Sequence, residues 1–174
     1  MSREALFTGR SGQLVVMAEF LVRQMNVAIP EVDVGDDVVV VRDDHDEITR
    51  VQVKATATIE ERRQSDRFYA QFNLRLSQLK SGPRHLVYAL VVRRNDRWEE
   101  FLIVRRSVLY ELRNTYRVGS EAEDDDKLVL GLTFTSSDVT TSQGAVSFQP
   151  FRGAFTPWPP ADEVPIGVVG MNPQ

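Results

Sequence analysis

The sequence contains no cysteine, and that absence removes several classes of site. A chain without thiols forms no disulfide framework, no cysteine nucleophile and no thiolate zinc centre. Histidine is scarce as well, since His45 and His85 are the only two, so a zinc site built from imidazoles is not expected. Disulfide scaffolds, thiol enzymes and common zinc proteins are therefore set aside.

Long apolar runs are also missing. No stretch approaches the roughly 20 residues that a membrane-spanning helix needs, and the N-terminus, M-S-R-E-A-L-F-T-G-R, lacks the apolar core of a signal peptide. We therefore expect a cytoplasmic protein with no membrane partner. Hydrophobic residues make up 42% of the 174-residue chain and charged residues 26%, which predicts one ordinary globular domain with a decorated terminus.

A strong positive charge is absent too, because the net charge is −4. The charges are spread unevenly: residues 1–49 carry net −6, residues 50–117 carry +8, and residues 118–174 carry −6. The total argues against a generic nucleic-acid binder, whereas the basic middle could form a phosphate-facing surface. The equally good alternative is that these charges mix over ordinary solvated faces in three dimensions.

The chain does contain clear helical patterns. Residues 12–26 predict a helix, with Ser11 and Gly12 at its start. This segment is apolar nearly all round, which predicts a well-buried helix. Residues 74–80 predict a short helical turn, and residues 107–113 predict a further helix.

Strands are predicted where β-branched and aromatic residues gather between turn signals. The run at 86–92, L-V-Y-A-L-V-V, is apolar throughout and is typical of a strand buried on both faces. Together the patterns predict an α/β fold, with a mixed central sheet flanked by helices over residues 1–117 and a β-rich extension over residues 118–174. The strands are expected at 37–42, 48–55, 68–74, 86–92, 98–105, 128–134 and 145–148, followed by an irregular tail from Pro150.

The most informative stretch is a predicted hairpin that runs from Asp37 through the acidic turn D-D-H-D-E to V-Q-V-K-A-T at 51–56. Gln52 and Lys54 are two residues apart on one strand, so their side chains project from the same face, and the hairpin can bring both near Asp37. A carboxylate, a second oxygen ligand and an ammonium at one sheet edge suit metal-assisted phosphodiester hydrolysis. The plainer alternatives are a strand-initiating turn at Asp37 and a surface ion pair at Lys54.

The chain carries three short motifs in the order G-R-S-G-Q (9–13), D-V-G-D-D (33–37) and V-Q-V-K-A-T (51–56). These motifs resemble those of the PD-(D/E)XK nuclease superfamily. They look closest to small bacterial endonuclease-like families with a Q-x-K variant of the triplet, and archaeal Holliday-junction resolvases share the layout. The resemblance covers about residues 9–105. It implies a restriction-endonuclease-like core, DNA as the partner, and Mg²⁺ or Mn²⁺ as the cofactor.

The resemblance also implies roles for individual residues. Asp37 takes the position of the metal-binding aspartate, Gln52 that of the acidic residue in the triplet, and Lys54 that of the lysine that orients or activates the attacking water. Gln13 falls where many relatives place a helix glutamate that completes the metal shell. Two expected acids are thus amides, which can ligate Mg²⁺ without a formal charge and should bind it weakly unless substrate phosphate adds ligands.

Neighbouring acids could compensate for the missing charge. Asp33 and Asp36 lie near Asp37 in sequence. Glu19 lies on the same predicted helix as the glutamine of the G-R-S-G-Q motif, roughly 120° further round the helix axis. Glu19 is a candidate migrated metal ligand. A structural pair with Arg75 or Lys54 is the equal alternative, because a carboxylate in an apolar helix needs a partner.

Arg62, Arg63 and Arg67 follow the triplet directly, and in the implied fold this segment lies beside the site, where it could contact phosphates. The alternative is a mobile charged loop. We therefore expect a divalent-metal-dependent DNA endonuclease, working as a homodimer where both strands of a duplex are cut. One alternative is a weak or inactive nuclease-fold module that binds DNA or a protein, which the two amides favour. Another is an RNA nuclease or toxin-like defence component.

Overall fold

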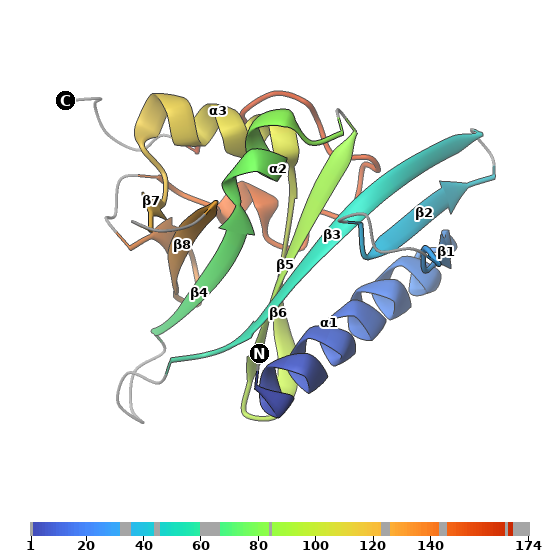
Figure 1. Cartoon of the computed structure of the whole chain (residues 1–174), viewed down its shortest axis with the longest axis horizontal. Coiled ribbons are helices and arrows are strands. Elements are labelled where there is room, and N and C mark those ends of the chain that lie inside the picture. The colour runs from blue at the N-terminus through green and yellow to red at the C-terminus, as the bar shows by residue number, and fades with distance from the viewer. Residues whose placement is uncertain are drawn as a thin grey trace.

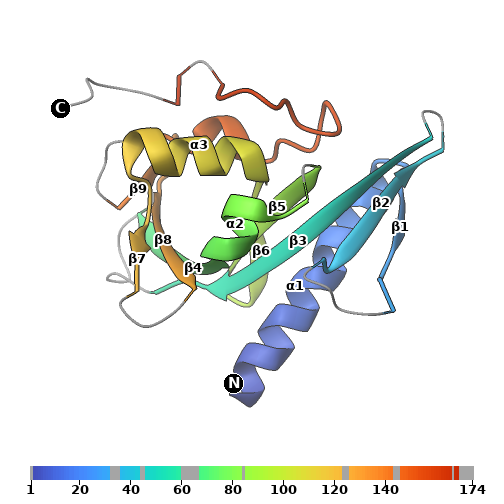
Figure 2. The ribbon, with the colours of Figure 1, turned by 45° about the horizontal axis from the view of Figure 1, so that its top comes forward.

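Figure 1 shows the computed structural model of the chain, which describes residues 2–31, 36–43, 46–59, 67–83, 85–122, 126–142, 146–165 and 167–168. A long helix lies on one face of a five-stranded sheet, and a smaller sheet with two further helices lies on the other face (Figure 2). None of the described helices is long and apolar enough to cross a membrane. The described elements are, in chain order, α1 (Arg3–Val22), β1 (Asn26–Ala28), β2 (Val38–Arg42), β3 (Glu47–Ala57), β4 (Phe68–Arg75), α2 (Leu76–Ser81), β5 (Leu86–Arg94), β6 (Arg97–Arg105), α3 (Arg106–Tyr116), β7 (Ser120–Glu121), β8 (Lys127–Phe134), β9 (Val139–Thr141) and the 3₁₀ turn η1 (Gln149–Phe151).

The central sheet has the order β1-β2-β3-β5-β6, in which β3 and β5 run parallel and the other neighbouring pairs are antiparallel. The predicted α/β fold with a mixed sheet flanked by helices is therefore confirmed. β5 is buried on both faces, as its apolar run predicts. Val87, Ala89 and Val91 belong to the core under α1, and Tyr88 and Leu90 belong to the core under the smaller sheet.

α1 begins earlier than the predicted helix. It starts at Arg3, where the hydroxyl of Ser2 accepts a hydrogen bond from the Ala5 N–H at 3.2 Å. Gly12, predicted as the helix start, lies instead at a close approach of α1 to the sheet, where an added Cβ would come within 2.4 Å of the Ala55 Cβ. This glycine therefore serves packing rather than helix initiation.

The prediction that α1 is well buried is wrong. Gly12, Val16 and Phe20 are buried against the sheet, whereas Phe7 and Leu14 are more than half exposed. A helix packed on one face of a sheet buries a single stripe of side chains. Leu14, Leu21 and Val22 therefore face away from the core although they are apolar.

The predicted strand at 68–74 is confirmed as β4, and it opens the smaller sheet. β4 pairs along its length with β8, which confirms the predicted strand at 128–134. β7 and β9 pair with β8 in turn. At the predicted strand 145–148, residue 145 lies outside the described residues, and Ser147 makes an isolated bridge with Thr140.

The segment that follows η1 is irregular, as predicted, yet it contributes to the core. Phe155 and Trp158 pack edge-on against Phe20 of α1, with ring centroids 5.3 and 4.6 Å away. Arg42, at the end of β2, donates to the backbone carbonyl of Trp158 at 2.6 Å. The segment is therefore held against α1 and the central sheet.

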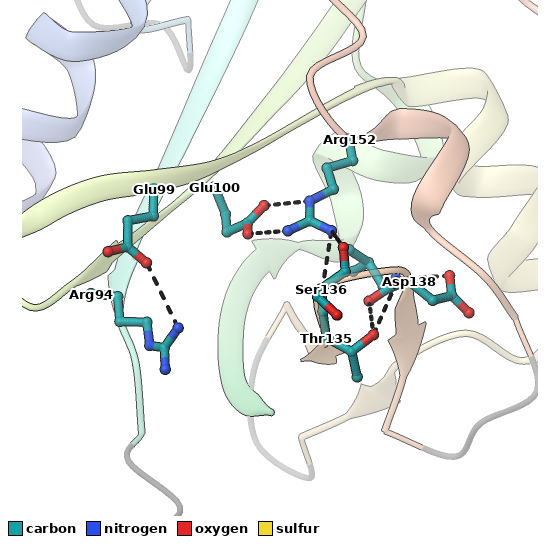
Figure 3. Close-up of polar contacts among 8 residues, drawn as sticks. Arg94, Glu99, Glu100, Thr135, Ser136, Asp138 and Arg152 are labelled. Atoms are coloured by element: carbon teal, nitrogen blue, oxygen red, sulfur yellow. Dashed lines mark hydrogen bonds and ion pairs between the residues drawn. The ribbon is translucent and has the colours of Figure 1, made fainter. Parts of the chain in front are cut away.

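A buried ion pair also fixes this segment (Figure 3). Arg152 donates to both carboxylate oxygens of Glu100 on β6, with 2.8 Å between Nε and Oε2. It also donates to the backbone carbonyl of Thr135, beyond β8, at 3.1 Å. Glu100 is 7% exposed, so the guanidinium compensates a carboxylate that has been removed from water. The neighbouring pair of Arg94 and Glu99 is more open and longer, at 3.9 Å.

Candidate active site

Asp37 stands directly before β2 and is held by β3. Its backbone N–H donates to the Val51 carbonyl at 2.9 Å. Its carboxylate oxygen Oδ2 accepts hydrogen bonds from the Val53 backbone N–H at 2.7 Å and from the side-chain amide of Gln52. The antiparallel pairing of β2 with β3, which sets Val38 opposite Val51, fixes this geometry.

Gln52 and Lys54 project from the same face of β3, as their spacing predicts. Their register partners on β5 are Tyr88 and Leu90, whose side chains lie in the core under the smaller sheet. Gln52 is buried and Lys54 is half-buried. The structure therefore brings Gln52 into contact with Asp37 and places Lys54 on the same face, two residues along the strand.

Two residues that sequence reasoning did not select extend this polar group. Gln78 on α2 donates its side-chain N–H to Oε1 of Gln52 at 3.1 Å. Tyr88 on β5 donates its hydroxyl to Oε1 of Gln78 at 3.3 Å. Gln78 lies 26 residues from Gln52 in a segment with no distinguishing pattern, and the apolar run around Tyr88 marks it only as core.

The Tyr88 hydroxyl acts as a donor because it stays protonated. Burial raises the pKa of the Tyr88 phenol well above its ordinary value of 10.0, and the nearby charge of Arg106 lowers it by a smaller amount. At neutral pH the phenol therefore carries its hydrogen and can donate it to Gln78.

α2, which carries Gln78, is anchored at both ends. The Asp126 carboxylate accepts hydrogen bonds from the hydroxyl and the backbone N–H of Ser77. These two hydrogen bonds, the hydroxyl one first, lower the pKa of Asp126. At the other end, Arg106 donates to the Leu79 carbonyl at 2.7 Å. Gln78 is thus presented to the site from a fixed backbone.

Gln13 lies beside the site but contacts its backbone. Its side-chain N–H donates to the backbone carbonyl of Asp37, and its Oε1 accepts from Arg10 at 2.5 Å. The helix amide therefore holds the start of β2, and its oxygen is engaged by an arginine of the same helix.

The acids considered as compensating ligands are paired elsewhere. Glu19 forms an ion pair with Arg23, four residues further along α1, at 2.6 Å, rather than with a cation of the sheet. Asp36, whose side chain is buried, pairs with Arg50 at 3.1 Å. Asp33 lies outside the described residues.

The predicted nucleic-acid contacts are only partly described. Arg67 is exposed directly before β4, whereas Arg62 and Arg63 lie outside the described residues. Arg94 is close to this end of β4, with its guanidinium 4.7 Å from the ring centroid of Phe68. Two arginines therefore lie where β4 begins, and one of them is paired with Glu99.

The side chains at Asp37 and Gln52 offer oxygen ligands, which are the type of ligand that a hard cation binds. Within the described residues, no group of three or more histidine, aspartate and glutamate side chains could hold a metal ion. Carboxylate and amide oxygens are nevertheless ligands that Mg²⁺ accepts. Gln52 now turns its nitrogen toward Asp37, so its amide must turn over before its oxygen can share a cation with that carboxylate. With that rotation, the two residues fit a divalent cation whose other ligands are water or phosphate.

Comparisons with known proteins place the fold. A scan against protein-family models gives no match. A comparison with curated protein sequences gives none either. Among solved structures, the chain is similar to a bacterial homing endonuclease, I-Ssp6803I, with a TM-score of 0.54 and 16% identity over 88% of each chain. At that identity the likeness shows the fold alone, and this chain shares the fold of that nuclease.

Proposed function

We propose that this protein is a divalent-metal-dependent endonuclease that hydrolyses phosphodiester bonds in DNA. The observation that carries the proposal is the contact of Gln52 with the Asp37 carboxylate, with Lys54 on the same face of β3. The likeness to a bacterial homing endonuclease supports the proposal. A shared fold does not establish a function by itself, and here the chain also carries side chains whose chemistry suits phosphodiester hydrolysis. The PD-(D/E)XK resemblance with its Q-x-K triplet is part of this proposal.

Each residue of the proposed site has a distinct role. Asp37 supplies the charged ligand for Mg²⁺ or Mn²⁺, and Gln52 supplies a neutral amide oxygen. The bound cation would polarise the phosphate and activate a water molecule. Lys54 places its ammonium where negative charge develops on the phosphate. Gln13 supports Asp37 through its backbone, and Glu19 is left out because its carboxylate pairs with Arg23.

DNA is the proposed partner because its phosphodiester is the kind of group that a cation at Asp37 and the ammonium of Lys54 would act on. Arg62, Arg63 and Arg67 are proposed to contact the backbone, where cations set affinity and its salt dependence. Symmetric cleavage of a duplex needs two copies of the site, so a homodimer belongs to the proposal.

The test is cleavage of supercoiled, linear, branched and single-stranded DNA with Mg²⁺ or Mn²⁺. Asp37→Ala and Lys54→Ala are compared with the parent and with Glu99→Gln, which changes an exposed acid on β6. We expect metal-dependent cutting by the parent and the control, with a loss of about 100-fold or more in both site variants. Cutting that persists in Asp37→Ala would contradict the proposal, and the preferred DNA form identifies the substrate shape.

A second candidate function is a binding module without cleavage. The observation that favours it is that Asp37 Oδ2 accepts two hydrogen bonds from within the protein, one from the Val53 backbone and one from the Gln52 side chain. DNA binding that is retained in Asp37→Ala, with no cutting of any substrate by the parent, would select this reading.

A further inference from the structure

We infer that Gln78 is a positioning residue that sets which end of the Gln52 amide faces Asp37, and that Tyr88 biases this choice. The inference rests on the proposed function, because it concerns the cation site of the proposed nuclease. The observation behind it is a chain of three hydrogen bonds that joins Tyr88 to Asp37 through the side-chain amides of Gln78 and Gln52.

The direction of every bond in this chain is fixed by chemistry. An amide nitrogen only donates and an amide oxygen only accepts, and an ionised carboxylate only accepts. Tyr88 donates to the oxygen of Gln78, the nitrogen of Gln78 donates to the oxygen of Gln52, and the nitrogen of Gln52 donates to Asp37. One amide therefore cannot turn over without breaking its bond to the next.

Cation binding through the Gln52 oxygen requires the whole chain to reverse. Once that oxygen faces a cation at Asp37, the Gln52 nitrogen points toward Gln78, which must present its own oxygen. The Gln78 nitrogen then points toward Tyr88, whose hydroxyl must accept rather than donate. Since α2 is anchored by Asp126 and Arg106, the amide is expected to turn in place rather than move away.

Tyr88 favours the present orientation. Its side chain is fully buried, and its hydroxyl now donates to Gln78. After the reversal this hydroxyl accepts from Gln78, and its own hydrogen needs a different acceptor. A buried donor without an acceptor is costly, so the phenol opposes the orientation that binds a cation. Removing that hydroxyl should therefore strengthen cation binding.

The test is the affinity for Mn²⁺, measured by calorimetry on the full chain. Tyr88→Phe keeps the ring and removes the bias, so we expect Mn²⁺ to bind about threefold to tenfold more tightly than to the parent. Tyr110→Phe, which removes a half-buried phenol on α3, is the matched control and should leave the affinity unchanged.

A double-mutant comparison isolates the relay from general packing. Gln78→Met removes the hydrogen bonds of Gln78 with Gln52 and Tyr88 while keeping the length of the side chain. In that background Tyr88→Phe should no longer change the Mn²⁺ affinity, because the coupling passes through Gln78. A purely structural role would shift the unfolding midpoint and leave the Mn²⁺ affinity alone. If the parent binds Mn²⁺, an unchanged or weaker affinity in Tyr88→Phe, or the same gain in both backgrounds, overturns the inference.

A metal-free readout separates this inference from the proposed function. The side-chain N–H resonances of Gln52, measured by NMR without metal, should shift in both Tyr88→Phe and Gln78→Met and stay in place in Tyr110→Phe. Resonances that do not move overturn the relay whatever Mn²⁺ does. Conversely, shifted resonances in a protein that binds no Mn²⁺ through Asp37 would support the relay and overturn the proposed cation site.

Discussion

At the scale of single residues, the group around Asp37 joins β3 and α2 through the side-chain amides of Gln52 and Gln78. Gln52 and Lys54 share a face because strand side chains alternate, and a tight hairpin returns them to Asp37. Gln78 reaches Gln52 across 26 residues through the packing of α2 on the sheet. A polar residue in a short helix has the same local pattern whether it faces water or a buried amide, so sequence could not select it.

Replacing the neutral side chain of Gln52 by a charged carboxylate tests whether this residue is a ligand of the proposed cation site. In Gln52→Glu, the hydrogen bond from the Gln52 amide to Asp37 is replaced by a contact of two carboxylates, so we expect the metal-free protein to lose about 1–3 kcal/mol of unfolding free energy. The added charge should also tighten Mn²⁺ binding by about tenfold or more, and Mn²⁺ should restore the stability. Urea unfolding with and without Mn²⁺ measures both effects.

The matched control for this change is Gln71→Glu on β4, a half-buried position outside the polar group. It adds the same charge, and its unfolding should respond no more strongly to Mn²⁺ than that of the parent. Equal responses of the two variants to Mn²⁺ would mean that Gln52 is not a ligand position.

At the scale of elements, glycine shows how a local signal can mislead. Gly12 follows Ser11 and suggests a helix start, whereas its function in α1 is close packing on Ala55. We expect Gly12→Ala to cost about 1–3 kcal/mol of unfolding free energy, because the added Cβ meets the sheet. Gly9→Ala, on the same helix with no atom within 4 Å of its added Cβ, should instead gain about 0.5–1 kcal/mol. Similar effects of the two substitutions in chemical unfolding would contradict this packing.

The anchoring of α2 gives a prediction for acid stability. Hydrogen bonds from Ser77 lower the pKa of Asp126 below its ordinary value of 3.8, so the folded state favours the ionised carboxylate. The stability that it contributes is fully present above 3.8 and is lost as the pH falls through the lower folded pKa. Asp126→Asn should therefore be less stable than the parent at neutral pH, and the difference should shrink in that acid window.

The measurement for this prediction is the urea midpoint as a function of pH. Glu111→Gln, an exposed change on α3, serves as the control. A parent and an Asp126→Asn variant whose midpoints stay equally far apart at every pH would show that the carboxylate does not act through its charge.

At the scale of the whole molecule, sequence predicts that the central sheet is covered on both faces, but it does not predict where the C-terminal segment packs. The continuous apolar run of β5 predicts burial on both faces, and the structure confirms this prediction. The packing of Phe155 and Trp158 on Phe20 joins residues more than a hundred positions apart, and proline-rich sequence carries no signal for such partners. Long-range contacts of this kind decide which irregular segments belong to the core.

The ion pair of Glu100 and Arg152 is expected to hold this segment in place. Arg152→Met leaves a buried carboxylate without its cation, so the unfolding free energy should fall by about 3 kcal/mol. Arg94→Met disrupts the longer and more exposed pair with Glu99 and should cost no more than about 1 kcal/mol. Chemical unfolding of both variants measures the difference, and equal losses would show that burial does not set the value of these pairs.

The central claim is that Asp37 holds the cation of a DNA-cutting site. The most direct measurement is the initial rate at which supercoiled DNA is nicked by the parent and by Asp37→Asn, with Mg²⁺ and with a chelator, at equal concentrations of folded protein. We predict nicking by the parent that needs Mg²⁺ and falls by about 100-fold or more in Asp37→Asn. Nicking at the same rate in both proteins, or in the presence of the chelator, would contradict the account.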